Sequence, residues 1–411
     1  MPKHNVKTKN KDMKVLLAPM NFATQRVLIV KELQKRGIYA RHIQYLDGER
    51  PLKFELDKVF SAKNKMDALS YALDEDFDIY HFWQRSLLFE RNNTWPTGLD
   101  LPFIKARGKK IIHRFTGFDL RLPTKDKTFN PHSPFHHGTF PPFNEKKQLE
   151  YIDFLREYVD QFLVQDPELL QFMPEAKIIP RGLNLENWQF VGLDDKADKP
   201  PLVVHAPTNK GVKGTPYVLK AVENLKSEGL KFDFKLVQGM SHADARAVYE
   251  QADIIIDQLL IGATGVLTLE GWALGKPVIV YLREDLFEPF YGGELPIGNA
   301  TPDTIEDTLR KMIKDRDWRQ DLSKKGRDLV EKHHDIKDVA HQCLELYEDL
   351  LDKPAQHPKT ALDVQYIMSQ YKNYGLKHSL QKIEYAIKKH GPKWFVNILR
   401  KIYRLRPKFL R

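Results

Sequence analysis

The sequence contains a single cysteine, Cys343, among its 411 residues. One thiol excludes an internal disulfide and fits a reducing compartment, and the helical pattern around it favours a buried thiol over a nucleophile. The chain has no stretch of about 18 uncharged apolar residues, so no membrane-spanning helix is expected. Residues 1–12 are polar and basic, without the apolar segment of a secretory signal. These absences together predict a cytoplasmic protein.

Two kinds of cofactor motif are missing as well. Neither half of the chain contains GxGxxG, so a dinucleotide cofactor is not expected. The stretch 122–145 holds His132, His136 and His137, but it lacks cysteines, and adjacent histidines seldom share one metal ion with good geometry. No cofactor and no metal site is therefore predicted. A stretch of this length is more typical of a binding loop, here for an acceptor substrate.

Net charge is absent from most of the chain. The formal charge of +10 arises within residues 376–411, where 11 lysines and arginines stand beside one acid, while the other residues carry 54 of each sign. Apolar residues at helical spacing predict a basic amphipathic helical tail at 351–411, whose residues 376–411 bind an anionic membrane surface. A helix docked on the protein's own N-terminal domain is the alternative. The neutral body offers no basic groove, so nucleic acid is not an expected partner.

Short β-branched or aromatic runs alternate with amphipathic helical patterns, which is typical of parallel βαβ units. The predicted fold class is α/β, with two doubly wound domains at 13–183 and 184–350, a polar tail at 1–12 and the helical tail at 351–411. Ligands are expected at the carboxyl ends of the strands, where the two domains face a central cleft. Strands are expected near residues 13–17, 39–45, 78–82, 109–115, 160–164, 201–206, 232–237, 253–257 and 277–281.

The stretch GATGVLTLEGWALGKPVIV, 262–280, places a glycine-containing loop between a strand and a helix. A helix that begins near Gly265 would present free backbone N–H groups and the positive end of its dipole to a phosphate. Glu270 would then lie about one and a half turns into that helix and could accept from two ribose hydroxyls. The alternative is an ordinary packed helix that tolerates an early glutamate.

The loop HAPTNKGVKGT, 205–215, also follows a predicted strand. Its Lys210 and Lys213 could stabilise the charge of a diphosphate leaving group. A solvated loop charge is the alternative for either lysine.

With these motifs, residues 201–281 resemble the C-terminal domain of group 1 (family four) glycosyltransferases, which have the GT-B fold of two Rossmann-like domains. YEQADIII and IIPRGLNLENW are similar to further elements of that family. The resemblance implies metal-independent transfer from a nucleotide-diphosphate sugar, with Glu270 on the ribose. Further donor-binding residues are implied at the phosphates and the base: Lys210, Lys213, Gly265, Val266, Leu267, Gly239 and Met240.

One position departs from the family. Its motif has an earlier glutamate eight residues before the second one, and this chain has Gly262 there. That glutamate contacts the transferred sugar in the family, so the departure bears on sugar specificity and activity. Asp257 and Gln258 are the nearby candidates to replace it.

In the N-terminal half, KKIIHRFTGFDLRL, 109–122, is similar to the family's His-Gly-Ser-Asp-x-Arg segment. Thr116 stands where the family often has an active-site histidine, and Asp119 is the better candidate to hold a sugar, with a turn-capping role as its alternative. His113 is a third catalytic candidate, although isolated strand histidines are more often core residues.

The sequence therefore predicts a retaining glycosyltransferase at the inner face of the cell membrane. It would move a sugar from a nucleotide-diphosphate sugar to a lipid-linked glycan or a cell-envelope polysaccharide. The alternatives are a non-catalytic glycan- or partner-binding module and a sugar epimerase on the same fold.

Overall fold

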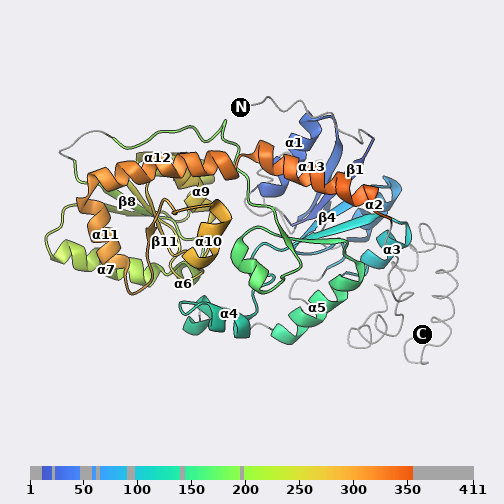
Figure 1. Cartoon of the computed structure of the whole chain (residues 1–411), viewed down its shortest axis with the longest axis horizontal. Helices are drawn as coiled ribbons and strands as arrows, with labels where there is room; N and C mark the ends of the chain where they lie inside the picture. Colours follow the sequence, from blue (N-terminus) through green and yellow to red (C-terminus); the bar gives the residue numbers. More distant parts are fainter. Residues whose placement is uncertain are drawn as a thin grey trace. The chain divides into compact units, whose positions relative to one another are not determined.

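The computed structural model describes residues 12–20, 24–46, 58–61, 65–89, 98–138, 144–194 and 199–354. Contacts between Cα atoms divide the chain into two compact units (Figure 1). The first unit contains the chain up to Asp119, Lys146–Leu163 and the chain from Ala340 on, and the second contains Leu120–Glu145 and Val164–Val339. The predicted tails at 1–12 and 351–411, and with them the proposed membrane-binding residues 376–411, lie almost wholly outside the described residues.

These units differ in composition from the predicted domains 13–183 and 184–350. The segments 120–145 and 164–183 make their contacts with the second unit, and the chain returns to the first unit at Ala340. That return occurs within helix α13 (Ile336–Asp352), on which the buried Tyr347 donates to or accepts from His81 of the first sheet at 2.7 Å. Cys343 on the same helix is fully buried, as predicted, and burial raises the pKa of its thiol to about 11.

The first sheet has seven strands in the order β3-β2-β1-β4-β5-β6-β7. Its recorded pairs are parallel, and its direction of growth reverses between β1 and β4. The strands are β1 (Lys14–Pro19), β2 (Tyr39–Leu46), β3 (Lys58–Ser61), β4 (Ile79–Trp83), β5 (Lys110–Arg114), β6 (Gln161–Val164) and β7 (Lys177–Ile178). The helices between them are α1 (Gln25–Lys35), α2 (Lys65–Asp74), α3 (Leu101–Ala106), α4 (Pro123–Phe129), η1 (Pro134–His137), α5 (Glu145–Tyr158) and η2 (Pro167–Gln171).

The second sheet has five parallel strands in the order β12-β11-β10-β8-β9. They are β8 (Leu202–His205), β9 (Asp233–Leu236), β10 (Ile254–Ile256), β11 (Val278–Val280) and β12 (Gly298–Asn299). Its helices are α6 (Lys210–Lys213), α7 (Thr215–Ser227), α8 (His242–Gln251), α9 (Val266–Ala273), α10 (Glu284–Tyr291), α11 (Ile305–Lys314) and α12 (Arg316–His333). The α/β class and each strand predicted from the sequence are confirmed. The short β3, β7 and β12 were not predicted.

Helix α1 shows how apolar spacing and a terminal glycine predict a helix and its end. Val27, Val30 and Leu33 share one face and are all buried, as their spacing predicts. The helix ends where Gly37 adopts a left-handed backbone with φ of 81°. The N–H groups of Gly37 and Ile38 then close back onto the last turn, at 2.9 and 3.1 Å from their carbonyl acceptors.

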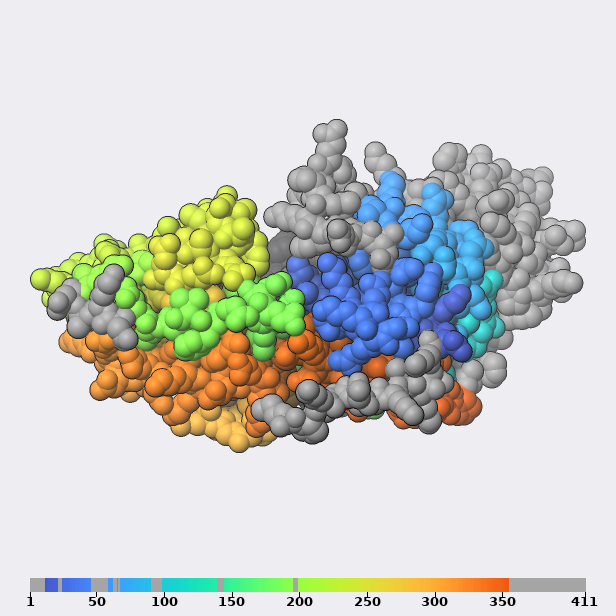
Figure 2. All heavy atoms as spheres, turned by 90° about the horizontal axis from the view of Figure 1, so that it is seen from above, coloured from blue at the N-terminus to red at the C-terminus, as the bar shows by residue number. Residues whose placement is uncertain are grey.

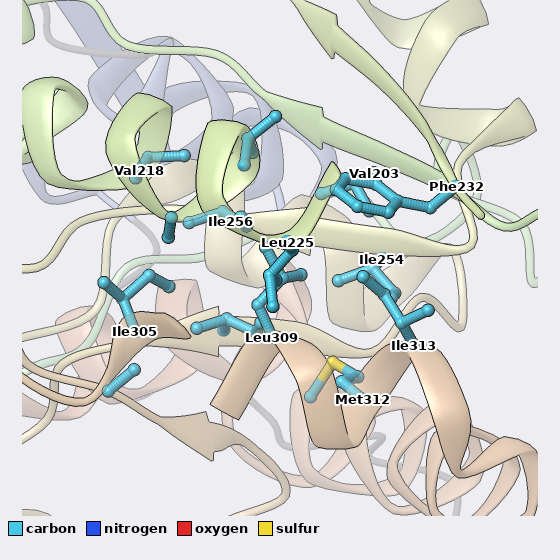
Figure 3. Packing of buried hydrophobic residues seen from close by; sticks show 14 of the residues in the cluster. Val203, Val218, Leu225, Phe232, Ile254, Ile256, Ile305, Leu309, Met312 and Ile313 are labelled. Atoms are coloured by element: carbon cyan, nitrogen blue, oxygen red, sulfur yellow. The ribbon is translucent and has the colours of Figure 1, made fainter. Parts of the chain in front are cut away.

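A hydrophobic cluster fixes β10 in the second unit (Figure 3). Ile254 and Ile256 of β10 are fully buried in this cluster, together with Leu225 of α7 and with Leu309 and Met312 of α11. Burial of this much apolar surface anchors the strand whose carboxyl end carries Asp257. The cluster therefore sets the position of Asp257.

Replacing Leu309 by alanine should lower the free energy of unfolding of the second unit by about 3 kcal/mol, because the side chain is fully buried and leaves a cavity. Urea unfolding followed by circular dichroism measures this loss. Leu219→Ala on α7 is the matched control, since that leucine is 42% exposed. Equal losses in the two variants would contradict the assigned core.

Among the residues that the structure describes, no helix combines the length and the hydropathy needed to cross a bilayer.

Candidate functional site

A buried carboxylate stands at the carboxyl end of β10. The side chain of Asp257 is fully buried, and its Oδ1 accepts from Lys213 Nζ at 2.7 Å. Its Oδ2 accepts from the hydroxyl and the backbone N–H of Thr268, at 2.7 and 3.2 Å. One carboxylate thus joins the ammonium group of Lys213 to the first turn of α9.

Gly265 is the N-cap of α9 and offers no side chain to cap it. A Cβ at this position would lie 2.2 Å from Asp257 Oδ2, so only glycine leaves room for the carboxylate. Within the described chain, the backbone N–H groups of Gly265, Val266 and Leu267 have no recorded acceptor. The helix start therefore keeps open donors and a positive dipole end, as the sequence predicted.

The lysine loop forms the short helix α6, whose N-cap Asn209 accepts from the N–H groups of Gly211 and Val212. Lys213 also donates to Gln258 Oε1 at 2.8 Å and is mostly buried, so the alternative of a solvated loop charge is wrong for this residue. Lys210, at the other end of α6, is exposed.

The electrostatics of Asp257 follow from this pairing. Burial by itself would raise the pKa of the Asp257 carboxyl, but the charge of Lys213 and the hydrogen bonds from Lys213 and Thr268 outweigh it. The net effect lowers the pKa of Asp257 below its usual value, and the group is ionised at neutral pH.

Glu270 lies further along α9 and is also buried. Its Oε1 lies 2.9 Å from Nε2 of His242, the first residue of α8. Burial raises the pKa of Glu270, and the hydrogen bond and charge of His242 act in the opposite direction. Glu270 is therefore an ionisable group that has a polar partner in His242, and not part of the apolar face of the helix.

The sequence did not predict a role for His242, Trp188 or Arg246. The ring of His242 lies edge-on to Trp188 at 5.8 Å between centroids, and Arg246 stacks over the same indole at 4.8 Å.

Gly239 and Met240, which the sequence predicts near a nucleobase, form the loop just before α8. Gly239 has a left-handed φ of 68°, and Met240 is 44% exposed. The yellow-green segment that includes α8 lies at the surface in Figure 2.

Gly262, at the position of the missing family acid, has a left-handed backbone with φ of 72°. A Cβ there would lie 3.0 Å from Cγ of Arg283 and 3.2 Å from the ring of Tyr281. A side chain at this position would therefore contact Arg283 and Tyr281 closely, and the left-handed backbone would strain it. Of the suggested replacements, Asp257 and Gln258 are both committed to Lys213.

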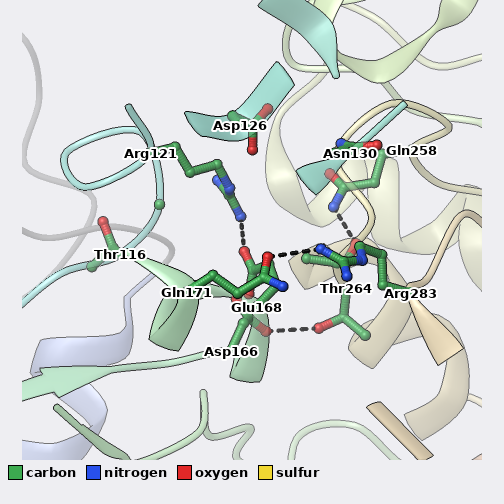
Figure 4. Close-up of polar contacts among 12 residues, drawn as sticks. Thr116, Arg121, Asp126, Asn130, Asp166, Glu168, Gln171, Gln258, Thr264 and Arg283 are labelled. Atoms are coloured by element: carbon green, nitrogen blue, oxygen red, sulfur yellow. Dashed lines mark hydrogen bonds and ion pairs between the residues drawn. The ribbon is translucent and has the colours of Figure 1, made fainter. Parts of the chain in front are cut away.

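A network of buried ions holds the loop before α9 (Figure 4). Arg181 forms two hydrogen bonds with Asp166, at 2.7 and 2.6 Å, and donates to the carbonyl oxygen of Thr264 at 2.9 Å. Arg121 pairs with Glu168 beside it, and both side chains are buried. Paired buried charges of this kind fix geometry, because either partner alone would be costly. The loop that leads to Gly265 is therefore rigidly placed.

The histidine-rich stretch 122–145 belongs to the second unit by its contacts. Asn130 donates to the carbonyl oxygen of Leu260 at 2.7 Å, His132 lies edge-on to Tyr281, and His137 lies 3.3 Å from the hydroxyl of Tyr217. In the described ranges, no group of three or more histidine, cysteine, aspartate or glutamate side chains could hold a metal ion. Binding of an acceptor by this stretch stays a prediction.

In the first unit, Thr116 and Asp119 lie in the loop after β5. The carboxylate of Asp119 accepts from the backbone N–H groups of Thr116 and Gly117, at 3.0 and 2.7 Å. These bonds are the ones expected if Asp119 caps the turn. Burial raises the pKa of Asp119. The hydroxyl of Thr116 accepts from the side chain of Gln84.

His113 of β5 lies in the core of the first unit. It is fully buried among Phe115, Tyr151 and Phe162, and neither ring nitrogen has a hydrogen-bond partner in the described chain. Burial lowers the pKa of His113 to about 3, so the ring is neutral. The core alternative therefore fits this histidine better than a catalytic role.

No protein-family model matches the chain, and no curated protein sequence does. Solved structures do match. A sucrose-phosphate synthase from Thermosynechococcus elongatus aligns with a TM-score of 0.57 and 14% identity, over 83% of this chain and 99% of the other. The catalytic domain of starch synthase IV from Arabidopsis thaliana, bound to ADP and acarbose, gives a TM-score of 0.52 and 12% identity, over 83% and 100%. WaaG, a glycosyltransferase involved in lipopolysaccharide biosynthesis, gives 0.50 and 12%, over 82% and 99%.

At these identities the likeness concerns the fold. The chain has the GT-B fold, as the sequence resemblance implied, with two parallel sheets each flanked by helices.

Proposed function

We propose that the chain is a glycosyltransferase that takes its sugar from a nucleotide-diphosphate sugar bound by the second unit. In this proposal the diphosphate lies at the start of α9, between the N–H groups of Gly265, Val266 and Leu267 and the ammonium group of Lys213. Glu270 accepts from the ribose hydroxyls, and Gly239 and Met240 border the base. Lys210 adds a second positive charge at the phosphates.

The arrangement around Asp257 carries this proposal. Its carboxylate bonds to Lys213 and to Thr268 of α9, so a cation and a helix start with open N–H groups meet at one point. Both features favour an anion, and both stabilise the charge that develops on a leaving diphosphate. Glu270 follows on the same helix, within reach of a nucleotide whose phosphates lie at that start.

The sequence adds finer elements to the proposal. Transfer would retain the configuration at the anomeric carbon, without a metal ion and without a covalent protein nucleophile. The acceptor would be a lipid-linked glycan or a cell-envelope polysaccharide bound by the first unit, where Thr116 and Asp119 follow β5. Residues 376–411 would hold the protein to the inner face of the cell membrane. The structural neighbour WaaG is involved in lipopolysaccharide biosynthesis, which supports this class of acceptor.

A second candidate is a non-catalytic module that binds a nucleotide or a glycan. The observation that favours it is the left-handed glycine at position 262, where the family has the acid that contacts the transferred sugar, and where a Cβ would contact Arg283 and Tyr281 closely. Release of nucleoside diphosphate from a nucleotide sugar, with or without an acceptor, would exclude this alternative. Turnover of the nucleotide sugar to an isomer would instead indicate an epimerase.

Glu270→Ala should weaken nucleotide binding by about 30-fold, because the ribose hydroxyls lose a charged acceptor. Isothermal titration calorimetry with UDP, GDP, ADP and dTDP on both proteins measures this difference. Glu223→Ala, which removes an exposed glutamate from α7, is the matched control. The proposal fails if the wild-type protein binds none of these nucleotides, or if Glu270→Ala binds them equally well.

A further inference from the structure

An exposed histidine contacts the buried acid of the candidate donor site. The side chain of His242 is 65% exposed, whereas that of Glu270 is 8% exposed, and the two meet at 2.9 Å between Nε2 and Oε1. A side chain this exposed is ordinarily free to rotate, but the ring of His242 also rests edge-on against the buried Trp188. The histidine is thus held on two sides, and its bond fixes one of the two carboxylate oxygens.

The charges around Glu270 come from two other elements. From α8, His242 and Arg246 act on the carboxylate, and Tyr249 interacts with it as well; from the end of β10, Asp257 faces it with a like charge. Burial and Asp257 raise the pKa of Glu270, whereas His242 and, less strongly, Arg246 lower it. His242 is the largest influence that favours the ionised form.

Resting on the proposed function, we propose that His242 is a positioning residue for the nucleotide: it fixes the carboxylate of Glu270 through Oε1 and leaves Oε2 to the ribose hydroxyls. The nucleotide itself then touches Glu270, and His242 acts through it. An ionised carboxylate accepts two hydroxyl hydrogen bonds, while a protonated one has a proton of its own to place. The role of His242 is therefore both geometric and electrostatic.

This role makes a prediction about pH. Without His242, nothing of comparable strength offsets the burial of Glu270, so its carboxylate takes up a proton at a higher pH than in the wild type. Nucleotide affinity in His242→Ala should be about threefold below that of the wild type at about pH 8, and about tenfold or more below it at about pH 6. Wild-type affinity should change much less over the same interval.

The test is calorimetry at both pH values with the nucleoside diphosphate that the wild-type protein prefers, using the full chain. His242→Gln keeps an N–H donor and should restore most of the affinity at both pH values. His341→Ala removes a histidine from another His–Glu pair, His341–Glu345 on α13, and should bind as the wild type does. Circular dichroism checks that each variant is folded.

The outcomes separate the two proposals. If no nucleotide binds to the wild type, the proposed function is wrong, and the proposed role of His242 is refuted as well. If nucleotides bind and Glu270→Ala weakens them, but His242→Ala binds as the wild type does at both pH values, only the role of His242 is refuted. A loss that is equal at both pH values and not restored by glutamine indicates a purely structural histidine and refutes it too.

Discussion

Lys213→Ala should weaken binding of a nucleoside diphosphate by about 100-fold and binding of the matching monophosphate by about tenfold or less. The ammonium group of Lys213 is fixed beside the start of α9 by Asp257 and Gln258, at 2.7 and 2.8 Å. In the proposed site this lysine acts on the phosphate furthest from the ribose, so its removal should discriminate between the two ligands. Calorimetry with the mono- and diphosphate of the preferred base measures both affinities.

Two variants complete this experiment. Lys220→Ala removes an exposed lysine from α7 and should bind both ligands normally. Glu270→Ala should weaken both ligands by similar factors, because each carries the same ribose. A similar loss of the mono- and diphosphate in Lys213→Ala would contradict the assignment of this lysine to the diphosphate.

Lys213→Ala should also be less stable, by about 3 kcal/mol, because it leaves the buried carboxylate of Asp257 without its cation. Burial then raises the pKa of Asp257 in the folded variant. In the wild type the lowered pKa contributes stability above the pKa of the unfolded chain, and this contribution is lost as the pH falls through the folded value. Thermal unfolding of the variant should accordingly lose less stability on acidification than that of the wild type.

Gly265→Ala should abolish measurable binding of the diphosphate and lower the free energy of unfolding by about 3 kcal/mol. The added Cβ would lie 2.2 Å from Oδ2 and 2.9 Å from Cγ of Asp257, so the carboxylate must move. A displaced Asp257 loses its bonds to Thr268 and no longer positions Lys213. The variant then alters both the start of α9 and the position of the Lys213 ammonium group, which together form the proposed phosphate site.

The matched control for this variant is Gly293→Ala, since a Cβ at Gly293 meets no atom within 4 Å and its backbone is not left-handed. Both variants add one methyl group, and only Gly265→Ala should affect binding. Chemical unfolding and calorimetry on the two proteins give the comparison. Normal nucleotide binding by Gly265→Ala would show that the start of α9 is not the phosphate site.

Much of the fold could be predicted because its signals are local. β-branched runs such as DIIID and PLVVH can only be short buried strands in this setting, and the structure has strands at both. The helix that begins at Val266 after Gly265, and the place of Glu270 on it, follow from a glycine loop and an apolar run within a few residues.

The parts that could not be predicted depend on residues far apart in the chain. Asp257 and Lys213 are 44 residues apart, and Glu270 and His242 are 28 residues apart, so no local sequence spacing predicts either contact. A lone histidine after a strand also carries no signal of its own. Its place at the first position of α8, facing α9, becomes visible only once the sheet has brought the two helices together.

The grouping of 120–145 with the second unit had no local signal either. Its helix α4 and the η1 helix that follows attach through contacts with distant residues, such as the hydrogen bond from Asn130 to the carbonyl oxygen of Leu260. Neither Asn130 nor Leu260 is distinctive in sequence. Sequential position alone assigned the stretch to the first domain.

The central claim is that the second unit binds a nucleoside diphosphate at the start of α9. A crystal structure of the full chain with the preferred nucleoside diphosphate tests it most directly. The account predicts the ribose hydroxyls within hydrogen-bond distance of Glu270 and the diphosphate in contact with Lys213 and the N–H groups of Gly265, Val266 and Leu267. A nucleotide bound elsewhere, with these groups unchanged and unoccupied, would contradict it.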